Sequence, residues 1–165
     1  MIHILVTGGT FDKSYDHIHG KLYFEKTHLP QMLKRSRCQL EVQVETLMMV
    51  DSLELTDRDL DRITQACISS PATQMVITHG TDRMVTTATR LAQEKELKHK
   101  TIVLTGAMIP YAFGSSSDGF FNLGSALAWV QSLAPEVYVA MQGEYFRWDQ
   151  VYKDQSQGVF RRKKT

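Results

Sequence analysis

Two short segments of the chain place glycines beside hydroxyl and carboxylate side chains. Thr10 follows Gly8-Gly9 after one apolar run, and Thr81-Asp82 follows Gly80 after another. Glycines let the chain turn sharply and let backbone N–H groups face a ligand. A threonine there could attack a carbonyl carbon while those N–H groups stabilise the oxyanion. The segments suggest nucleophilic chemistry on a small polar substrate. A structural turn or a phosphate cradle is the alternative for the first, although neither a dinucleotide fingerprint nor a P-loop is present.

Asp82 and Lys153 could support the second threonine. The Asp82 carboxylate could hold a substrate ammonium at the carboxyl edge of a sheet or cap the following helix, and the two roles are compatible. Lys153 could act as a base for Thr81 if it is desolvated, although a surface position is the usual one for a lysine.

Tyr15 and Ser52 are candidates in neighbouring loops. Tyr15 follows Thr10 closely and could relay the proton of its hydroxyl, or could fix the loop as an apolar side chain. Ser52, directly after Asp51, could hold a substrate carboxylate or serve as a turn residue. The sequence leaves both alternatives open.

Composition argues against several classes of protein. The 165 residues carry a net charge of +1, so we expect neither nucleic acid nor a membrane as partner, and the basic run Arg161–Lys164 is interpreted as a solvated, frayed terminus. Cys38 and Cys67 lack the spacing of a disulfide scaffold, and His17 and His19 lack a third metal ligand. No apolar run approaches the roughly 18 residues of a membrane span or resembles a signal peptide. We expect a cytoplasmic protein with no metal site.

The elements that must position these side chains alternate along the chain. Apolar runs predict five strands: Ile2–Thr7, Leu40–Thr46, Gln74–Thr78, Thr101–Thr105 and Glu136–Met141. Helical spacing predicts helices around Leu60–Ile68, Val85–Ala92 and Leu123–Val130, and a shorter one over Pro30–Arg37. Thr56 and Asp59 form a capping box for the first of the long helices. The alternating polar residues of 41–45 place the second strand near an edge.

This alternation predicts an α/β fold: a single-domain open parallel sheet, Rossmann- or flavodoxin-like, with helices on both faces and right-handed crossovers. We assign residues 1–155 to this domain and 156–165 to a basic C-terminal tail. Two segments, 11–24 and 107–119, match no element and are typical of lids or binding loops.

Four motifs in this order resemble the bacterial-type L-asparaginases, the asparaginase/glutaminase family whose nucleophiles are threonines. They are Thr7–Thr10, His79–Met84, Thr105–Pro110 followed by Ser117–Leu123, and Val139–Met141 with Lys153 downstream. The resemblance covers residues 1 to about 155 and implies hydrolysis of L-asparagine to L-aspartate and ammonia.

The resemblance also implies a role for each candidate residue. Thr10 would form the acyl-enzyme, and Tyr15 would assist it from a mobile lid. Thr81, Asp82 and Lys153 would form a second hydrogen-bonded set that supports attack or positions the hydrolytic water. The substrate-binding residues would be Ser52 for the α-carboxylate and Asp82 for the α-ammonium, together with Asp51, Gly80, Thr81 and Ala107. No cofactor is expected.

The chain departs from the family pattern in two ways. It matches the N-terminal domain only, so we expect a short form without the C-terminal domain that donates residues to a neighbouring subunit, and a homo-oligomer, either a dimer or a tetramer. Leu53 replaces a glutamine that helps to bind the α-amino group, and Asp51 or Glu54 could substitute for it. The alternatives are an amino-acid-binding or regulatory module with little turnover, and an amidase that acts on another amide such as glutamine or within a larger assembly.

Overall fold

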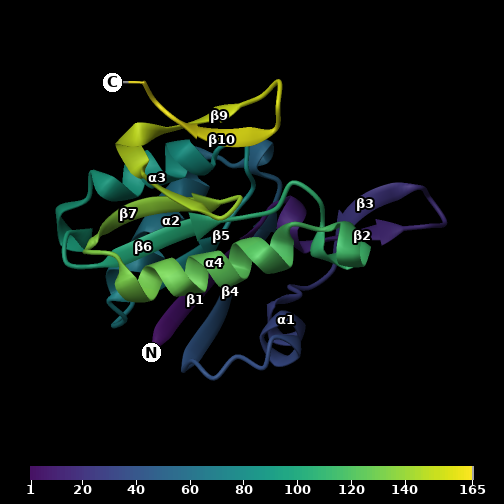
Figure 1. The fold of residues 1–165 in the computed structure, drawn as a ribbon, viewed down its shortest axis with the longest axis horizontal. Coiled ribbons are helices and arrows are strands. Elements are labelled where there is room, and N and C mark those ends of the chain that lie inside the picture. Colours follow the sequence, from purple (N-terminus) through teal and green to yellow (C-terminus); the bar gives the residue numbers. More distant parts are fainter. Residues whose placement is uncertain (165) are drawn as a thin grey trace.

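The structure, a computed structural model that describes residues 1–164, is built on a six-stranded sheet (Figure 1). The strand order is β4-β1-β5-β6-β7-β8. All neighbouring strands are parallel except β8, which pairs antiparallel with β7 at one edge. Their bounds are β1 Ile2–Gly8, β4 Val42–Val50, β5 Gln74–Thr78, β6 Thr101–Thr105, β7 Glu136–Met141 and β8 Glu144–Arg147.

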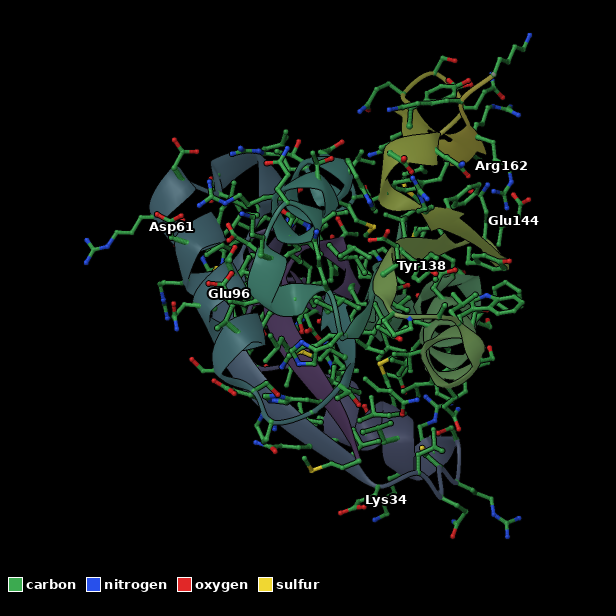
Figure 2. The ribbon with its side chains drawn as sticks, turned by 90° about the vertical axis from the view of Figure 1, so that its left-hand side faces the viewer. Lys34, Asp61, Glu96, Tyr138, Glu144 and Arg162 are labelled. Carbon is green, nitrogen blue, oxygen red and sulfur yellow. The ribbon has the colours of Figure 1, made fainter. Side chains whose placement is uncertain are left out.

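Helices cover both faces of this sheet, as predicted, and Figure 2 shows them on its two sides. On one face, α2 (Asp57–Ser69) and α3 (Met84–Ala92) pack on a core that contains Leu5; on the other, α1 (Leu29–Arg35) and α4 (Gly119–Ser132) pack on a core that contains Ile4 and Val6. Because successive strand residues point to opposite faces, the continuous aliphatic run of β1 is buried on both sides.

One crossover has the unexpected hand. The chain steps from β5 to β6 and from β6 to β7 in the same direction, yet α3 and α4 pack on opposite faces of the sheet. In the three other units, β1–α1–β4, β4–α2–β5 and β5–α3–β6, the direction of the step and the face that the helix covers correspond to one hand. The β6–α4–β7 unit therefore has the opposite hand. Because about 98% of such units are right-handed, this unit is the left-handed one, and the prediction of uniformly right-handed crossovers is wrong here. The consequence is that the segment after β6 crosses to the α1 face and contacts β2 and the turn after β1.

Local signals placed several boundaries correctly. The Thr56–Asp59 capping box is present at the start of α2, and β4 lies at the edge of the sheet. Asp82 is not the cap of α3, because the helix begins at Met84 and Arg83 occupies the N-cap position.

The two segments without a predicted element have defined structures. Within 11–24, strands β2 (Lys13–Asp16) and β3 (Lys21–Phe24) form a hairpin. It projects from the sheet at the end away from the N-terminus (Figure 1). Within 107–119, the 3₁₀ segment η4 (Tyr111–Ser116) contacts β2. The other 3₁₀ turns are η1 Thr10–Asp12, η2 Ser52–Glu54, η3 Lys95–Leu97 and η5 Trp148–Gln150.

The C-terminal residues also belong to the fold. Strands β9 (Val151–Asp154) and β10 (Val159–Arg162) form an antiparallel hairpin, in which Phe160 is 1% exposed. The interpretation of the basic run as a frayed terminus is therefore wrong for Arg161 and Arg162, because the alternating buried Phe160 holds them in a strand. Within the described residues, no helix combines the length and the apolar character needed to span a membrane.

Candidate active site

The two glycine–threonine segments meet where the sheet topology reverses. When the five parallel strands are numbered by their place in the chain, their order across the sheet is 2-1-3-4-5, and the reversal lies between β1 and β5. In open parallel sheets, ligands bind outside the carboxyl edge at such a point of reversal. Thr10 follows β1 and Thr81 follows β5.

Glycines allow the backbones of three loops to touch at this edge. A Cβ built on Gly9 would lie 2.4 Å from the N and Cα atoms of Gly80, and one built on Gly80 would lie 2.5 Å from the Cβ and Oγ atoms of Ser52. Gly9 also has a φ of +76°, which favours glycine. These contacts bring Thr10, Thr81 and Ser52 into one group, as the sequence predicted from their positions at strand ends.

Lys153 reaches this group from β9. Its Nζ atom donates hydrogen bonds to Thr81 Oγ1 at 2.8 Å and to Asp82 Oδ1 at 2.6 Å. The Lys153 side chain is only 8% exposed, so this is not the surface lysine that sequence alone would suggest. Because the Thr81 oxygen accepts from the ammonium, its own O–H is left to donate to another group.

His79 fixes the turn that carries Thr81. Its ring is fully buried: Nδ1 lies 2.7 Å from the Gly80 carbonyl oxygen and Nε2 lies 2.8 Å from Thr87 Oγ1. The carbonyl can only accept, so Nδ1 carries the proton and Nε2 accepts from the threonine. Burial lowers the pKa of His79 to about 4, which keeps the ring neutral. This agrees with a local packing role rather than a catalytic one.

Thr10 begins the short η1 turn, and Asp12 ties that turn to helix α1. The Asp12 carboxylate accepts hydrogen bonds from the His28 N–H at 2.7 Å and the Thr27 hydroxyl at 3.2 Å. Its second oxygen has no partner among the described residues. Burial raises the pKa of Asp12, although these hydrogen bonds partly oppose the rise. Asp12 thus joins the two ends of the β2–β3 hairpin.

Tyr15 lies on that hairpin and faces η4. Its ring packs edge-on against Phe113 with 6.2 Å between centroids, and the side chain is 54% exposed. Tyr15, Ala112, Phe113 and Ser116 line a hollow of about 420 Å³. The apolar role that the sequence left open for Tyr15 is therefore present, and its assistance to Thr10 stays a prediction.

The loop after β4 carries Ser52 and Asp51, and the structure places these two side chains differently. Ser52 is buried against Gly80. Asp51 forms an ion pair with Lys13 at the start of β2 and also accepts from the Leu53 N–H at 3.2 Å. The hydrogen bond from Lys13 holds the pKa of Asp51 below its usual range.

A family comparison fits this arrangement. The family model for the asparaginase N-terminal domain matches residues 1–161. The chain belongs to the asparaginase family.

Several named proteins are similar to the chain over part of their length. The chain is 30% identical over 133 residues to L-asparaginase 1 of Escherichia coli K12, which covers 76% of this chain and 39% of that protein. It is 39% identical over 79 residues to a human 60 kDa lysophospholipase, covering 47% of this chain and 14% of that protein. The structure of the thermostable L-asparaginase from Thermococcus kodakarensis matches with a TM-score of 0.83 at 25% identity, covering 98% of this chain and 50% of that one. The chain thus spans half or less of the length of these relatives.

In this asparaginase-family domain, the loop after β6 is held by side chains that the sequence analysis did not select. The Asp118 carboxylate accepts from the N–H groups of Met108 and Ile109, and the Asn122 amide donates to the Gly106 carbonyl oxygen at 2.9 Å. Ala107, predicted to bind substrate, is buried beside these residues.

Asp12 and Lys13 were missed as well. They follow Thr10 and Phe11 in the sequence. Two adjacent charged residues beside a glycine-rich turn are the signal that could have identified them.

Proposed function

We propose that this asparaginase-family chain hydrolyses L-asparagine to L-aspartate and ammonia through an acyl-enzyme on Thr10. The observation that carries this proposal is the buried Lys153, which donates to Thr81 in the loop whose Gly80 contacts Gly9. A buried ammonium that joins a hydroxyl to a carboxylate is costly unless it is well paired, and such groups are typical of sites that move protons.

In the first step, Thr10 Oγ1 forms a bond to the amide carbon and the C–N bond breaks. The proton of the Thr10 hydroxyl passes to the leaving nitrogen, which departs as ammonia. Backbone N–H groups of the glycine turns stabilise the negative charge that develops on the carbonyl oxygen. In the second step, water adds to the ester carbon, the bond to Thr10 breaks and the hydroxyl is restored.

Thr81, Asp82 and Lys153 act on the protons of both steps. Lys153 fixes the Thr81 oxygen by donating to it, so the Thr81 O–H is directed to another group such as the hydrolytic water or the nucleophile. Asp82 balances the charge of Lys153 with one oxygen. Its second oxygen is free to accept from a substrate ammonium.

The remaining predicted residues bind the substrate. Ser52 holds the α-carboxylate, and the main chain of Gly80 and Ala107 lines the site. Tyr15 covers the nucleophile from the hairpin. Asp51, which pairs with Lys13 and accepts from the Leu53 N–H, keeps a further acceptor site on each oxygen for the substrate.

Ammonia release from a panel of amides that includes L-asparagine and L-glutamine tests the proposal. Thr10→Ala and Thr81→Ala should each lower kcat at least a hundredfold. Thr89→Ala is the matched control, since its hydroxyl donates to the Val85 carbonyl oxygen of the same helix, α3. Full activity in both site variants would contradict the mechanism. Aspartate binding without any ammonia release would instead favour a binding module, and release only with a copurifying partner would favour an amidase of a larger assembly.

We also keep the homo-oligomer, a dimer or tetramer, and the cytoplasmic location as proposals. Several large apolar side chains are exposed, including Phe113 beside Tyr15 and Phe121 in α4, which agrees with a covered surface. Sedimentation equilibrium of the purified chain tests the first proposal, and a monomer at micromolar concentration would contradict it. Fractionation of cells tests the second.

A further inference from the structure

We propose that Gln142 is a positioning residue for Lys153: its side-chain amide holds the strand opposite Lys153 and so fixes the ammonium against Thr81. The inference rests on the proposed function for the role of Lys153. Gln142 acts on Lys153 through Phe160, so it is a positioning and not a catalytic residue.

The first observation concerns how the hairpin that carries Lys153 is attached. Within residues 1–164, β9 and β10 pair only with each other and are not part of the six-stranded sheet. A two-stranded hairpin is marginally stable by itself, so other contacts must hold it in place. The position of the hairpin matters, because Lys153 Nζ lies 2.8 Å from Thr81 Oγ1 in the loop after β5.

The second observation is that Gln142 binds the main chain of β10 at two points. Its Nε2 atom donates to the Phe160 carbonyl oxygen at 2.6 Å, and its Oε1 atom accepts from the Phe160 N–H at 2.9 Å. The amide thus pairs with β10 as a neighbouring strand would. Gln142 is exposed and Phe160 is buried. Loss of the amide would therefore leave a buried donor and a buried acceptor without this partner, which is costly.

The third observation is the register of the hairpin, in which Phe160 lies directly opposite Lys153. In an antiparallel pair, opposite residues exchange either both main-chain hydrogen bonds or none. Because both main-chain groups of Phe160 bond to Gln142, its pair with Lys153 is of the second kind, in which the side chains lie closer together. The bond from the Lys163 N–H to the Gln150 carbonyl oxygen, three pairs further along, agrees with this alternation. Gln142 therefore holds the residue whose side chain flanks that of Lys153.

Gln142 is itself fixed by the core. It follows β7 with a φ of +51°, and its N–H donates to Asn122 Oδ1 at 3.1 Å. Asn122 is fully buried in α4, and its Nδ2 atom donates to the Gly106 carbonyl oxygen after β6 at 2.9 Å. A positive φ outside glycine is uncommon and persists where the surrounding structure fixes it. A path of hydrogen bonds thus runs from the end of β6 to Phe160, so the main sheet helps to place Lys153.

Kinetics of Gln142→Met test the inference in the whole chain. The variant keeps the length of the side chain but loses both hydrogen bonds, so kcat for L-asparagine should fall about tenfold while KM stays within twofold. Gln142→Gly, which suits the positive φ, should show the same change. A kcat within twofold of wild type in either folded variant, or a loss carried by KM alone, would overturn the inference.

Gln131→Met is the matched control for these variants. This exposed glutamine of α4 donates its amide to the Leu127 carbonyl oxygen of the same helix. Its replacement should leave kcat at the wild-type value. A tenfold loss in this variant would overturn the inference, because the loss in Gln142→Met would then not be specific to β10.

A double variant separates positioning from a general structural effect. If Gln142 acts through Lys153, then Gln142→Met/Lys153→Met should have the kcat of Lys153→Met alone, within twofold. A further tenfold loss in the double variant would overturn the inference, since an independent structural role adds to the loss from Lys153.

Acetylation with acetic anhydride, measured by mass spectrometry, tests the position of Lys153 without turnover. The Lys153 side chain is buried in the wild type, and Gln142→Met should raise its labelling rate at least threefold. Lys100, buried just before β6 at the opposite end of the sheet, should keep its wild-type rate. An unchanged rate at Lys153, or an equal rise at Lys100, would overturn the inference. Wild-type protein that releases no ammonia would contradict the proposed function, and the labelling would still decide the role of Gln142.

Discussion

Gly9 and Gly80 lie so close that a Cβ on Gly9 would stand 2.4 Å from backbone atoms of Gly80. This contact joins the loop of the first threonine to the loop of the second at the carboxyl edge of β1 and β5. The site depends on it, because a wider separation would move Thr10 away from Thr81 and Lys153.

Gly9→Ala should therefore lose both stability and activity. The methyl group meets backbone rather than a flexible side chain, and φ at Gly9 is positive, so we expect a loss of about 2 kcal/mol or more in the free energy of unfolding. Gly124→Ala is the control: this exposed glycine of α4 has nothing within 4 Å of its Cβ position, and alanine should stabilise the helix by up to about 1 kcal/mol. Urea unfolding of both variants gives the comparison. Equal effects would show that the close contact is not needed.

Lys153→Met tests the second threonine set. Removing the donor to Thr81 Oγ1 and Asp82 should lower kcat about a hundredfold or more, with a smaller change in KM. Lys98→Met, at an exposed position, is the matched control and should retain wild-type kcat. A kcat within twofold of wild type for Lys153→Met would remove Lys153 from the mechanism.

Much of the fold was accessible from sequence because its signals are local. The continuous aliphatic strands, the capping box of α2 and the glycine turns each act over a few residues. The left-handed β6–α4–β7 unit was not accessible, because the segment before α4 contacts parts of the chain that are distant in sequence, β2 and η1. Such long-range contacts leave no periodic pattern.

Phe160→Ala tests the C-terminal hairpin, whose second strand, β10, the sequence analysis placed outside the domain. Phe160 packs in the main core and lies opposite Lys153 in the β9–β10 register. Its loss should cost about 3 kcal/mol of stability and lower activity by releasing Lys153. Arg161→Ala, whose exposed side chain pairs with Asp154, should cost less than about 1 kcal/mol. Equal thermal stabilities of the two variants would contradict this role of β10.

The residues of the candidate site could be predicted from the sequence, but not all the contacts between them. The resemblance located Thr10, Thr81, Asp82 and Lys153, and the structure shows the last three in contact. Lys13 was not found, because its partner Asp51 lies in the distant loop after β4 and the hairpin between them had no clear pattern.

His79 should make the protein sensitive to mild acid. The buried ring has a pKa near 4, against 6.5 for a free histidine, so the unfolded chain takes up a proton that the folded chain does not. The free energy of unfolding should therefore have its full value above about pH 6.5. It should fall by up to about 3 kcal/mol as the pH drops to 4.

Urea unfolding of wild type and His79→Gln across this range checks the prediction, and the profile of the variant should be flatter. Asp12, whose pKa is raised, acts in the opposite sense, since its cost grows as pH rises. Its contribution is common to both proteins and cancels in their difference. Parallel profiles would contradict the assignment to His79.

Trapping of the covalent intermediate tests the central claim most directly. Wild-type protein is mixed with L-asparagine, quenched in acid within milliseconds and digested for mass spectrometry. An aspartyl group should appear on the peptide that contains Thr10, should accumulate further in Thr81→Ala as its hydrolysis slows, and should be absent in Thr10→Ala. Turnover by Thr10→Ala, or an adduct on the Thr81 peptide instead, would contradict Thr10 as the nucleophile.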